Sequence, residues 1–310
     1  MKICMLALTL AIVMNVWTVC AKEEFVQSTV TFRVLDEAGA PVTNAIVSYN
    51  SYTLARMVDG ITDTNGVFIY TDRVAGAISC RVFKDGYYET HGEIWGGPHK
   101  WTDHPMNTLT VTLKKIVAPS PLVFRQIEVL FIPELTVPVA FDFAVGDWVA
   151  PYGSGKCADV WLTAENRKTS SRDYDTKVTI TFSNALDGIQ DFMALRPEGV
   201  YVTSDLMPPQ EAPASGYTNS IVVFNSMRPG TPGATSWVAN RNHIFRVRTR
   251  TNEANEVVAE NVGWTVEDIR VGVGTNGKVG PMFSYYYNPD PKSISLEPID
   301  ADKSRRSKKP

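Results

Sequence analysis

Apolar and polar residues alternate over most of the chain, with the period of two that is typical of half-buried β-strands. In the first third of the chain, this alternation predicts strands within 30–34, 45–49, 67–70, 78–83 and 108–113. Turn-forming sequences separate the strands, such as 63–66 (DTNG), whose Asn-Gly pair favours the positive φ of a tight hairpin. Several short strands at close spacing predict an antiparallel β-sandwich.

The alternation returns beyond residue 139 and predicts further strands within 159–162, 177–182, 220–224, 244–249 and 282–287. Segment 244–273 is expected to form two or three strands around a turn at 252–255, and only 185–195 has the pattern of a short helix. We therefore expect an all-β chain, with a second, larger sandwich of jelly-roll or lectin-like kind.

Three consecutive tyrosines, Tyr285, Tyr286 and Tyr287, lie in the last predicted strand. Successive side chains of a strand point to opposite faces of its sheet. At least one of these rings must therefore face away from the core, unless a second layer covers it.

Three sequence segments, VLDEAGAPVTNAIVSY, TDTNGVFIY and VFKDGYYE, carry a resemblance to a known family. Over residues 27–115 the chain resembles the carboxypeptidase regulatory-like domain, a seven-stranded sandwich of the immunoglobulin or transthyretin-like type. The matching positions are Asp36, Gly39, Pro41, Val42, Ala45, Thr62, Asp63, Gly66, Phe68, Gly86 and Tyr87. These are turn and core positions, so the resemblance implies a fold and an accessory role, and it implies no peptidase activity.

The chain begins with the layout of a secretory signal peptide over residues 1–21. Lys2 precedes an apolar run over 6–17, and the small residues Val19 and Ala21 mark a cleavage site. The alternatives are a membrane anchor, for which the run is short, and a lipoprotein cysteine at Cys20, for which the preceding residues fit poorly. We expect an exported protein that is periplasmic, cell-surface or extracellular and has no transmembrane segment in the mature chain.

Composition changes along the chain suggest the remaining boundaries. We expect the regulatory-like sandwich over 22–116, a linker over 117–138 that is punctuated by prolines, the larger sandwich over 139–302 and a disordered basic tail over 303–310. Overall, 44% of the 310 residues are hydrophobic and 20% are charged, as in ordinary globular proteins. The net charge of −3 argues against nucleic acid as a partner.

Cleavage of the signal peptide would leave two cysteines, Cys80 and Cys157. They lie in different predicted domains, so a disulfide would have to join the two domains. Two buried thiols are an equally good interpretation, and the sequence leaves the pairing open.

Three histidines, His91, His99 and His104, lie close together in the sequence THGEIWGGPHKWTDHP, beside Glu93 and Asp103. Imidazole and carboxylate groups that converge on one loop can bind zinc or a similar ion. The alternative is an exposed loop with solvated histidines. No other cofactor is expected.

Catalytic motifs are weak throughout the sequence. It has no GxSxG motif, and segment 153–156 (GSGK) lacks two positions of a phosphate-binding loop. His243 is the single histidine of the larger region. A hydrolase would need two carboxylates to meet in space, with candidates at Asp142, Asp147, Asp159, Glu198 and Asp205.

Aromatic residues are the stronger signal in the larger region. Trp148, Tyr152 and Trp237 lie among turn formers and polar residues, where rings can stack on sugars or anchor a protein interface. We expect a non-enzymatic binding protein that recognises a glycan or a cell-surface protein through these residues. The alternatives are a hydrolase acting on extracellular polysaccharide and a structural envelope component, and the oligomeric state stays open.

Overall fold

The computed structural model describes residues 26–51, 57–74, 77–95, 108–135, 137–193, 200–274 and 277–299. Within these residues every regular element is a β-strand, so the prediction of an all-β fold is confirmed. The part of the chain that is described contains no helix of the length and apolarity needed to cross a membrane. The predicted signal peptide and basic tail lie outside the described residues.

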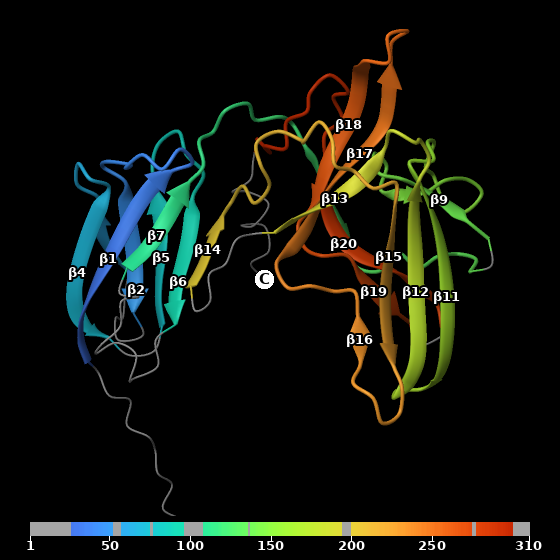
Figure 1. Ribbon diagram of the computed structural model, residues 1–310, viewed down its shortest axis with the longest axis horizontal. Helices are drawn as coiled ribbons and strands as arrows, with labels where there is room; N and C mark the ends of the chain where they lie inside the picture. Colours follow the sequence, from blue (N-terminus) through green and yellow to red (C-terminus); the bar gives the residue numbers. More distant parts are fainter. Residues whose placement is uncertain are drawn as a thin grey trace, which may run out of the picture.

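The first sandwich contains seven strands that follow one another in the chain (Figure 1). They are β1 (Val26–Asp36), β2 (Ile46–Ser51), β3 (Val58–Ile61), β4 (Val67–Val74), β5 (Ala77–Phe83), β6 (Thr90–Trp95) and β7 (Thr108–Leu113). Strand β1 pairs with β4 antiparallel and with β7 parallel, and this sheet faces the sheet of β2, β3, β5 and β6. Alternate residues point into the core, as Leu109, Val111 and Leu113 do in β7.

A strand from the second half of the chain completes the first sandwich. Strand β14 (Val200–Ser204) pairs antiparallel with β6, and Figure 1 shows it at that edge of the sheet. The expected domain that spans 139–302 without interruption is therefore wrong at this point. An edge strand has unpaired backbone groups, and β14 satisfies those of β6.

The second sandwich contains the other strands. They are β8 (Val123–Ile127), β9 (Val139–Asp142), β10 (Asp147–Trp148), β11 (Val160–Ser170), β12 (Asp173–Phe182), β13 (Gly188–Met193), β15 (Ser220–Met227), β16 (Ala234–Thr235), β17 (Arg241–Thr251), β18 (Val257–Thr265), β19 (Arg270–Val273) and β20 (Val279–Tyr287). One sheet has the order β10-β9-β11-β12-β15-β16, and the other has the order β13-β17-β18-β20-β19 with β8 beside β20. Apolar residues of both sheets form the larger core.

The expected linker is partly built into this second sandwich. Strand β8 pairs with β20 along its whole length, and Ile132 is buried in the larger core. Pro121 and Pro133 bracket a stretch without proline, which leaves its backbone N–H groups available for the sheet. Part of the expected linker is therefore a strand of the second sandwich and not a loose spacer.

The predicted helix at 185–195 is also wrong, because this segment contains β13. The strand pairs with β17 from Gly188 opposite Arg246 to Met193 opposite Arg241. A Cβ on Gly188 would lie 2.6 Å from the Thr218 carbonyl oxygen, so the glycine allows a close approach of two backbones. Pairing with an existing strand outweighs the weak helical pattern of so short a segment.

The three tyrosines of β20 follow the predicted alternation. Tyr285 and Tyr287 point into the larger core, whereas Tyr286 points to the opposite face. There Tyr286 stacks on Trp264, with ring centroids 4.7 Å apart, and it also contacts Phe124. A second layer thus covers the ring that faces away from the main core.

A buried carboxylate joins the two sandwiches. Glu297 has no exposed surface and accepts hydrogen bonds from the Tyr88 hydroxyl (2.9 Å) and from the backbone N–H groups of Val117 (3.0 Å) and Ala118 (3.3 Å). Tyr88 belongs to the first sandwich, and Glu297 follows the last strand of the second. These hydrogen bonds therefore link the two sandwiches where they meet.

Candidate functional site

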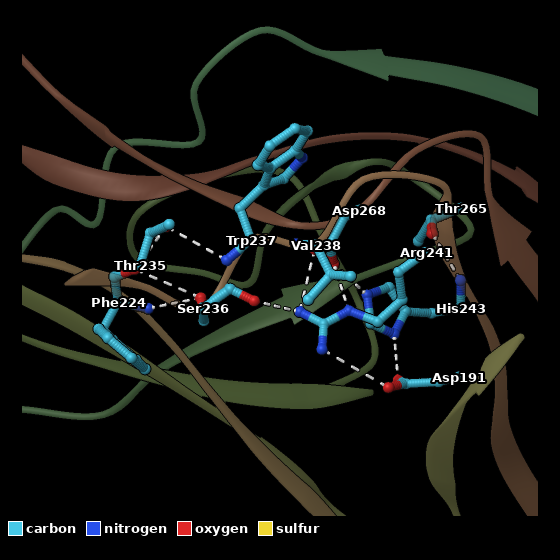
Figure 2. Close-up of polar contacts among 10 residues, drawn as sticks. All are labelled: Asp191, Phe224, Thr235, Ser236, Trp237, Val238, Arg241, His243, Thr265 and Asp268. Atoms are coloured by element: carbon cyan, nitrogen blue, oxygen red, sulfur yellow. Dashed lines mark hydrogen bonds and ion pairs between the residues drawn. The ribbon is translucent and has the colours of Figure 1, made fainter. Parts of the chain in front are cut away.

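Trp237 lies on the loop between β16 and β17, with 44% of its surface exposed (Figure 2). The backbone on both sides of the ring is held by hydrogen bonds. Ser236 N–H donates to the Phe224 carbonyl (3.0 Å), and Val238 N–H donates to Asp268 Oδ2 (2.7 Å). The loop is therefore fixed before any ligand arrives, which lowers the entropy cost of binding.

A buried charge cluster lies beneath this loop. The Asp268 side chain is 1% exposed and accepts hydrogen bonds from Arg241 Nε (3.1 Å) and Nη2 (2.9 Å) and from Val238 N–H. It also lies 2.7 Å from His243 Nε2. Burial raises the pKa of Asp268, but the hydrogen bonds from His243 and Arg241 outweigh it and hold the pKa below its usual range. Asp268 is therefore an ionised anchor for the loop.

His243 lies between two carboxylates. Its Nε2 faces Asp268, and its Nδ1 lies 2.8 Å from Oδ1 of Asp191, an ion-pair contact that lacks the alignment of a hydrogen bond. The backbone N–H of His243 donates to the Thr265 hydroxyl (2.9 Å). Because a carboxylate occupies the space beside each ring nitrogen, neither nitrogen is placed to take a proton from a substrate. The cluster ties β13 to β17 and to the loop after β18.

The ring of Trp237 points away from this cluster, on the opposite side of the loop from Arg241 (Figure 2). The guanidinium carbon of Arg270 lies 5.9 Å from the centroid of the ring, and Arg270 also forms an ion pair with Glu267. A flat apolar ring beside a cation and a carboxylate can stack on an apolar ligand face and bond polar groups at its rim.

The other two predicted contact residues have different surroundings. Trp148 is only 6% exposed and packs edge-on against Phe141 in the larger core, so its prediction as a contact residue is wrong. In the short strand β10, Asp147 is the more exposed of the two residues and Trp148 points inward. Tyr152 is exposed, and its hydroxyl donates to Glu134 (2.9 Å). It follows β10, at the opposite edge of the sheet from β16, so Tyr152 and Trp237 do not form one site.

The start of the predicted histidine loop is strand β6. On this strand His91 faces Glu89 and Asp205, and its Nε2 lies 3.4 Å from one carboxylate oxygen of each. These three side chains could hold a metal ion. The expected partner Glu93 is not in this group, and His99, His104 and Asp103 lie outside the described residues.

Two of the candidate hydrolytic carboxylates meet, but around a cation. Arg248 lies 2.7 Å from Asp142 and 2.7 Å from Asp159, in a left-handed backbone conformation (φ 60°). Asp147 accepts hydrogen bonds from the Ser154 N–H and hydroxyl and stabilises its own turn. Glu198 lies outside the described residues. Asp142 and Asp159 thus share one cation, and Asp159 and Arg248 line a hollow of about 540 Å³.

Other exposed aromatic residues, Trp161 among them, were not selected as contact residues from the sequence. Trp161 is 42% exposed and lies on the outer face of the sheet, as Phe224 does on β15. The alternation in β11, where Val160 and Leu162 are buried, places Trp161 outward and could have identified it. The anchor of the Trp237 loop, by contrast, is Asp268 on the loop between β18 and β19, and no local pattern predicts that contact.

The two cysteines of the described residues are free thiols. Cys80 is buried in the first core, where burial raises its pKa to about 12. Cys157 is half-buried in the second sandwich, and burial raises its pKa as well. The two thiols are therefore unpaired, as in the interpretation of two buried thiols, but only Cys80 is fully buried.

Comparisons with known proteins found only distant similarity. No family model matches the chain, and no curated protein matches it. A streptococcal ancillary pilin aligns over 67% of this chain and 58% of its own, at 11% identity and a TM-score of 0.22. A DUF3823 family protein from Parabacteroides merdae aligns over 87% of this chain and 98% of its own, at 8% identity and a TM-score of 0.20. At TM-scores this low, neither alignment indicates a function for this chain.

Proposed function

We propose that the chain is an exported, non-enzymatic binding protein that recognises a glycan through the Trp237 loop. The observation that carries this proposal is the exposed Trp237 ring on a backbone that is hydrogen-bonded on both sides. A preorganised aromatic ring is a common anchor at binding surfaces.

The small extent of the apolar surface favours a sugar over a protein. Beside Trp237, the loop exposes one other large apolar side chain, Val238, while the neighbouring Arg270 and Glu267 are charged. A standard protein interface buries about 800 Å² on each partner, much more than this loop offers. A sugar ring has apolar CH faces that can stack on one indole and hydroxyl groups that can bond the charged residues beside it.

The charge arrangement supports binding without turnover. Asp142 and Asp159 are both paired with Arg248, and His243 is flanked by Asp191 and Asp268. Each of these groups is already held by a charged partner within the protein, which leaves it poorly placed to exchange a proton with a substrate. The first sandwich would then be an accessory module, as its resemblance to the carboxypeptidase regulatory-like domain suggests.

The test is to bind the purified protein to a panel of soluble and insoluble polysaccharides and to follow the release of reducing ends in the same tubes. Retention on at least one polymer, without release of reducing ends, is the expected result. Release of reducing ends would favour the hydrolase instead. If no polymer retains the protein, the glycan proposal is wrong, and a protein partner or a structural role becomes the better account.

A further inference from the structure

The pairing of β6 with β14 brings three metal-binding side chain types to one face of the first sandwich. Thr203 on β14 lies opposite His91 on β6, and Asp205 N–H donates to the Glu89 carbonyl (2.8 Å). Side chains two residues apart on a strand share a face, and so do directly opposed residues of antiparallel strands. Glu89, His91 and Asp205 are therefore neighbours on the face that points away from the core.

The two carboxylates converge on a single nitrogen of His91. Its Nε2 lies 3.4 Å from Glu89 Oε1 and 3.4 Å from Asp205 Oδ1. His243 differs, because its two carboxylates lie at 2.7 and 2.8 Å and each faces a different ring nitrogen. Charge-assisted hydrogen bonds between nitrogen and oxygen are about 2.7–2.9 Å long, so the contacts of His91 are too long for that class.

The spacing of 3.4 Å suits ligands around a common metal ion. Zinc bonds of about 2.0–2.2 Å to nitrogen and oxygen place two ligands of a tetrahedron about 3.3–3.6 Å apart. The donor atoms of Glu89, His91 and Asp205 all lie within 4.8 Å of one another.

A buried polar atom without a partner lies beside this group. Thr203, directly opposite His91, is 7% exposed, and its Oγ1 has no hydrogen-bond partner among the described residues. A buried hydroxyl of this kind is costly unless a water or another ligand satisfies it. A water molecule on a bound metal ion would be such a ligand.

Two further features suit this group to a metal ion: a hollow beside two of its side chains, and an arginine that holds one carboxylate. Glu89 and Asp205, though not His91, line a hollow of about 440 Å³ at the seam between the sandwiches, so a ligand in the hollow can approach the two carboxylates. Arg81 on β5, opposite His91, holds Glu89 Oε1 through its Nε at 2.6 Å. Outer partners of this kind orient the ligands of metal sites.

We propose that Glu89, His91 and Asp205 bind one divalent zinc ion, with the fourth position open to water or to a ligand in the hollow. One imidazole and two carboxylates suit zinc, whereas calcium and magnesium prefer sites built from oxygen alone. Since Asp205 directly follows β14, the ion would fasten the strand from the second half of the chain to β6.

The experiment uses tag-free purified protein that has been treated with a chelator and dialysed. Zn²⁺ is titrated in competition with a chromophoric chelator, and Co²⁺ is added separately to record the visible bands of a four-coordinate site. We expect one zinc per chain and an affinity at least about tenfold lower in His91→Ala, because loss of even an outer partner costs 10–100-fold. Asp205→Asn, which keeps the shape of the side chain, should weaken binding in the same way.

Glu93→Gln is the matched control, because Glu93 lies on the same strand and two residues from His91 but outside the group. Its zinc affinity should equal that of the wild-type protein. The proposal is overturned if the wild-type protein takes up no zinc, in which case the group is an ion-pair cluster. It is also overturned if both His91→Ala and Asp205→Asn bind zinc as the wild-type protein does. If His91→Ala does not fold, Asp205→Asn alone decides the result.

Discussion

The buried carboxylate of Asp268 is the anchor of the Trp237 loop, and its removal should both destabilise the protein and release the loop. In Asp268→Ala, the Val238 N–H, the Arg241 guanidinium and the His243 ring lose their shared acceptor. Asp191→Ala is the matched control. Asp191 contacts the same arginine and histidine, but 52% of its side chain is exposed.

Burial sets the size of each effect. Removal of one partner from a buried ion pair costs about 3–5 kcal/mol, because the remaining charge is left without compensation. This range applies to Asp268→Ala, since the Asp268 side chain is almost wholly buried. An exposed ion pair contributes about 0.2–1 kcal/mol, and this range applies to Asp191→Ala.

Two measurements check these values. Urea unfolding followed by tryptophan fluorescence gives the free energy of unfolding, and hydrogen exchange gives the protection of the Val238 amide. Because the folded pKa of Asp268 is lowered, its contribution is present above the unfolded value of about 3.9 and is lost as the pH falls through the folded value. The difference between wild type and Asp268→Ala should therefore shrink below about pH 4.

Equal free energies of unfolding for Asp268→Ala and Asp191→Ala would show that Asp268 is not the anchor of the loop. Exchange of the Val238 amide at the wild-type rate in Asp268→Ala would show the same, since the loop would then be held by other contacts.

Three further predictions concern the second sandwich and the cysteines. Trp148→Ala should lower the free energy of urea unfolding by about 3–5 kcal/mol, because Trp148 is a core residue. Trp161→Ala, at an exposed position, should change this free energy by about 0.5 kcal/mol or less. Equal effects of the two substitutions would contradict the burial of Trp148. Arg248→Ala should cost about 3–5 kcal/mol in the same assay, since it leaves two buried carboxylates without a cation, and a loss below about 1 kcal/mol would contradict this. In the native protein, Cys80 should stay unlabelled by a thiol reagent until urea unfolds the first core, and a non-reducing digest should contain no peptide that links it to Cys157.

Local alternation predicted most strands but not how distant segments pair. It placed the tyrosines of β20 on opposite faces correctly, because the side chain period of a strand is a local property. It could not place β14 on β6, because that pairing joins segments about one hundred residues apart through backbone groups common to every residue. The same limit explains the helix predicted at 185–195, since the edge of β17 that receives β13 cannot be read from that segment.

For the candidate sites too, local sequence predicted the exposure or chemistry of single residues but not their partners from distant segments. The exposure of Trp237 agreed with its turn-rich sequence, but its anchor Asp268 lies on a different loop and has no local signal. Trp148 resembled Trp237 in sequence context, and only packing against Phe141 distinguishes the two. His91 was identified as a possible metal ligand, but its partner Asp205 depends on the pairing of β14 with β6.

The most direct test of glycan recognition compares Trp237→Ala with Trp161→Ala on a polysaccharide that retains the wild-type protein. The two tryptophans have nearly equal exposure, but only Trp237 lies on the anchored loop. We predict that Trp237→Ala weakens binding at least about tenfold, equivalent to about 1.4 kcal/mol, while Trp161→Ala binds like the wild-type protein. Unchanged binding by Trp237→Ala, or an equal loss in both variants, would contradict recognition through this loop.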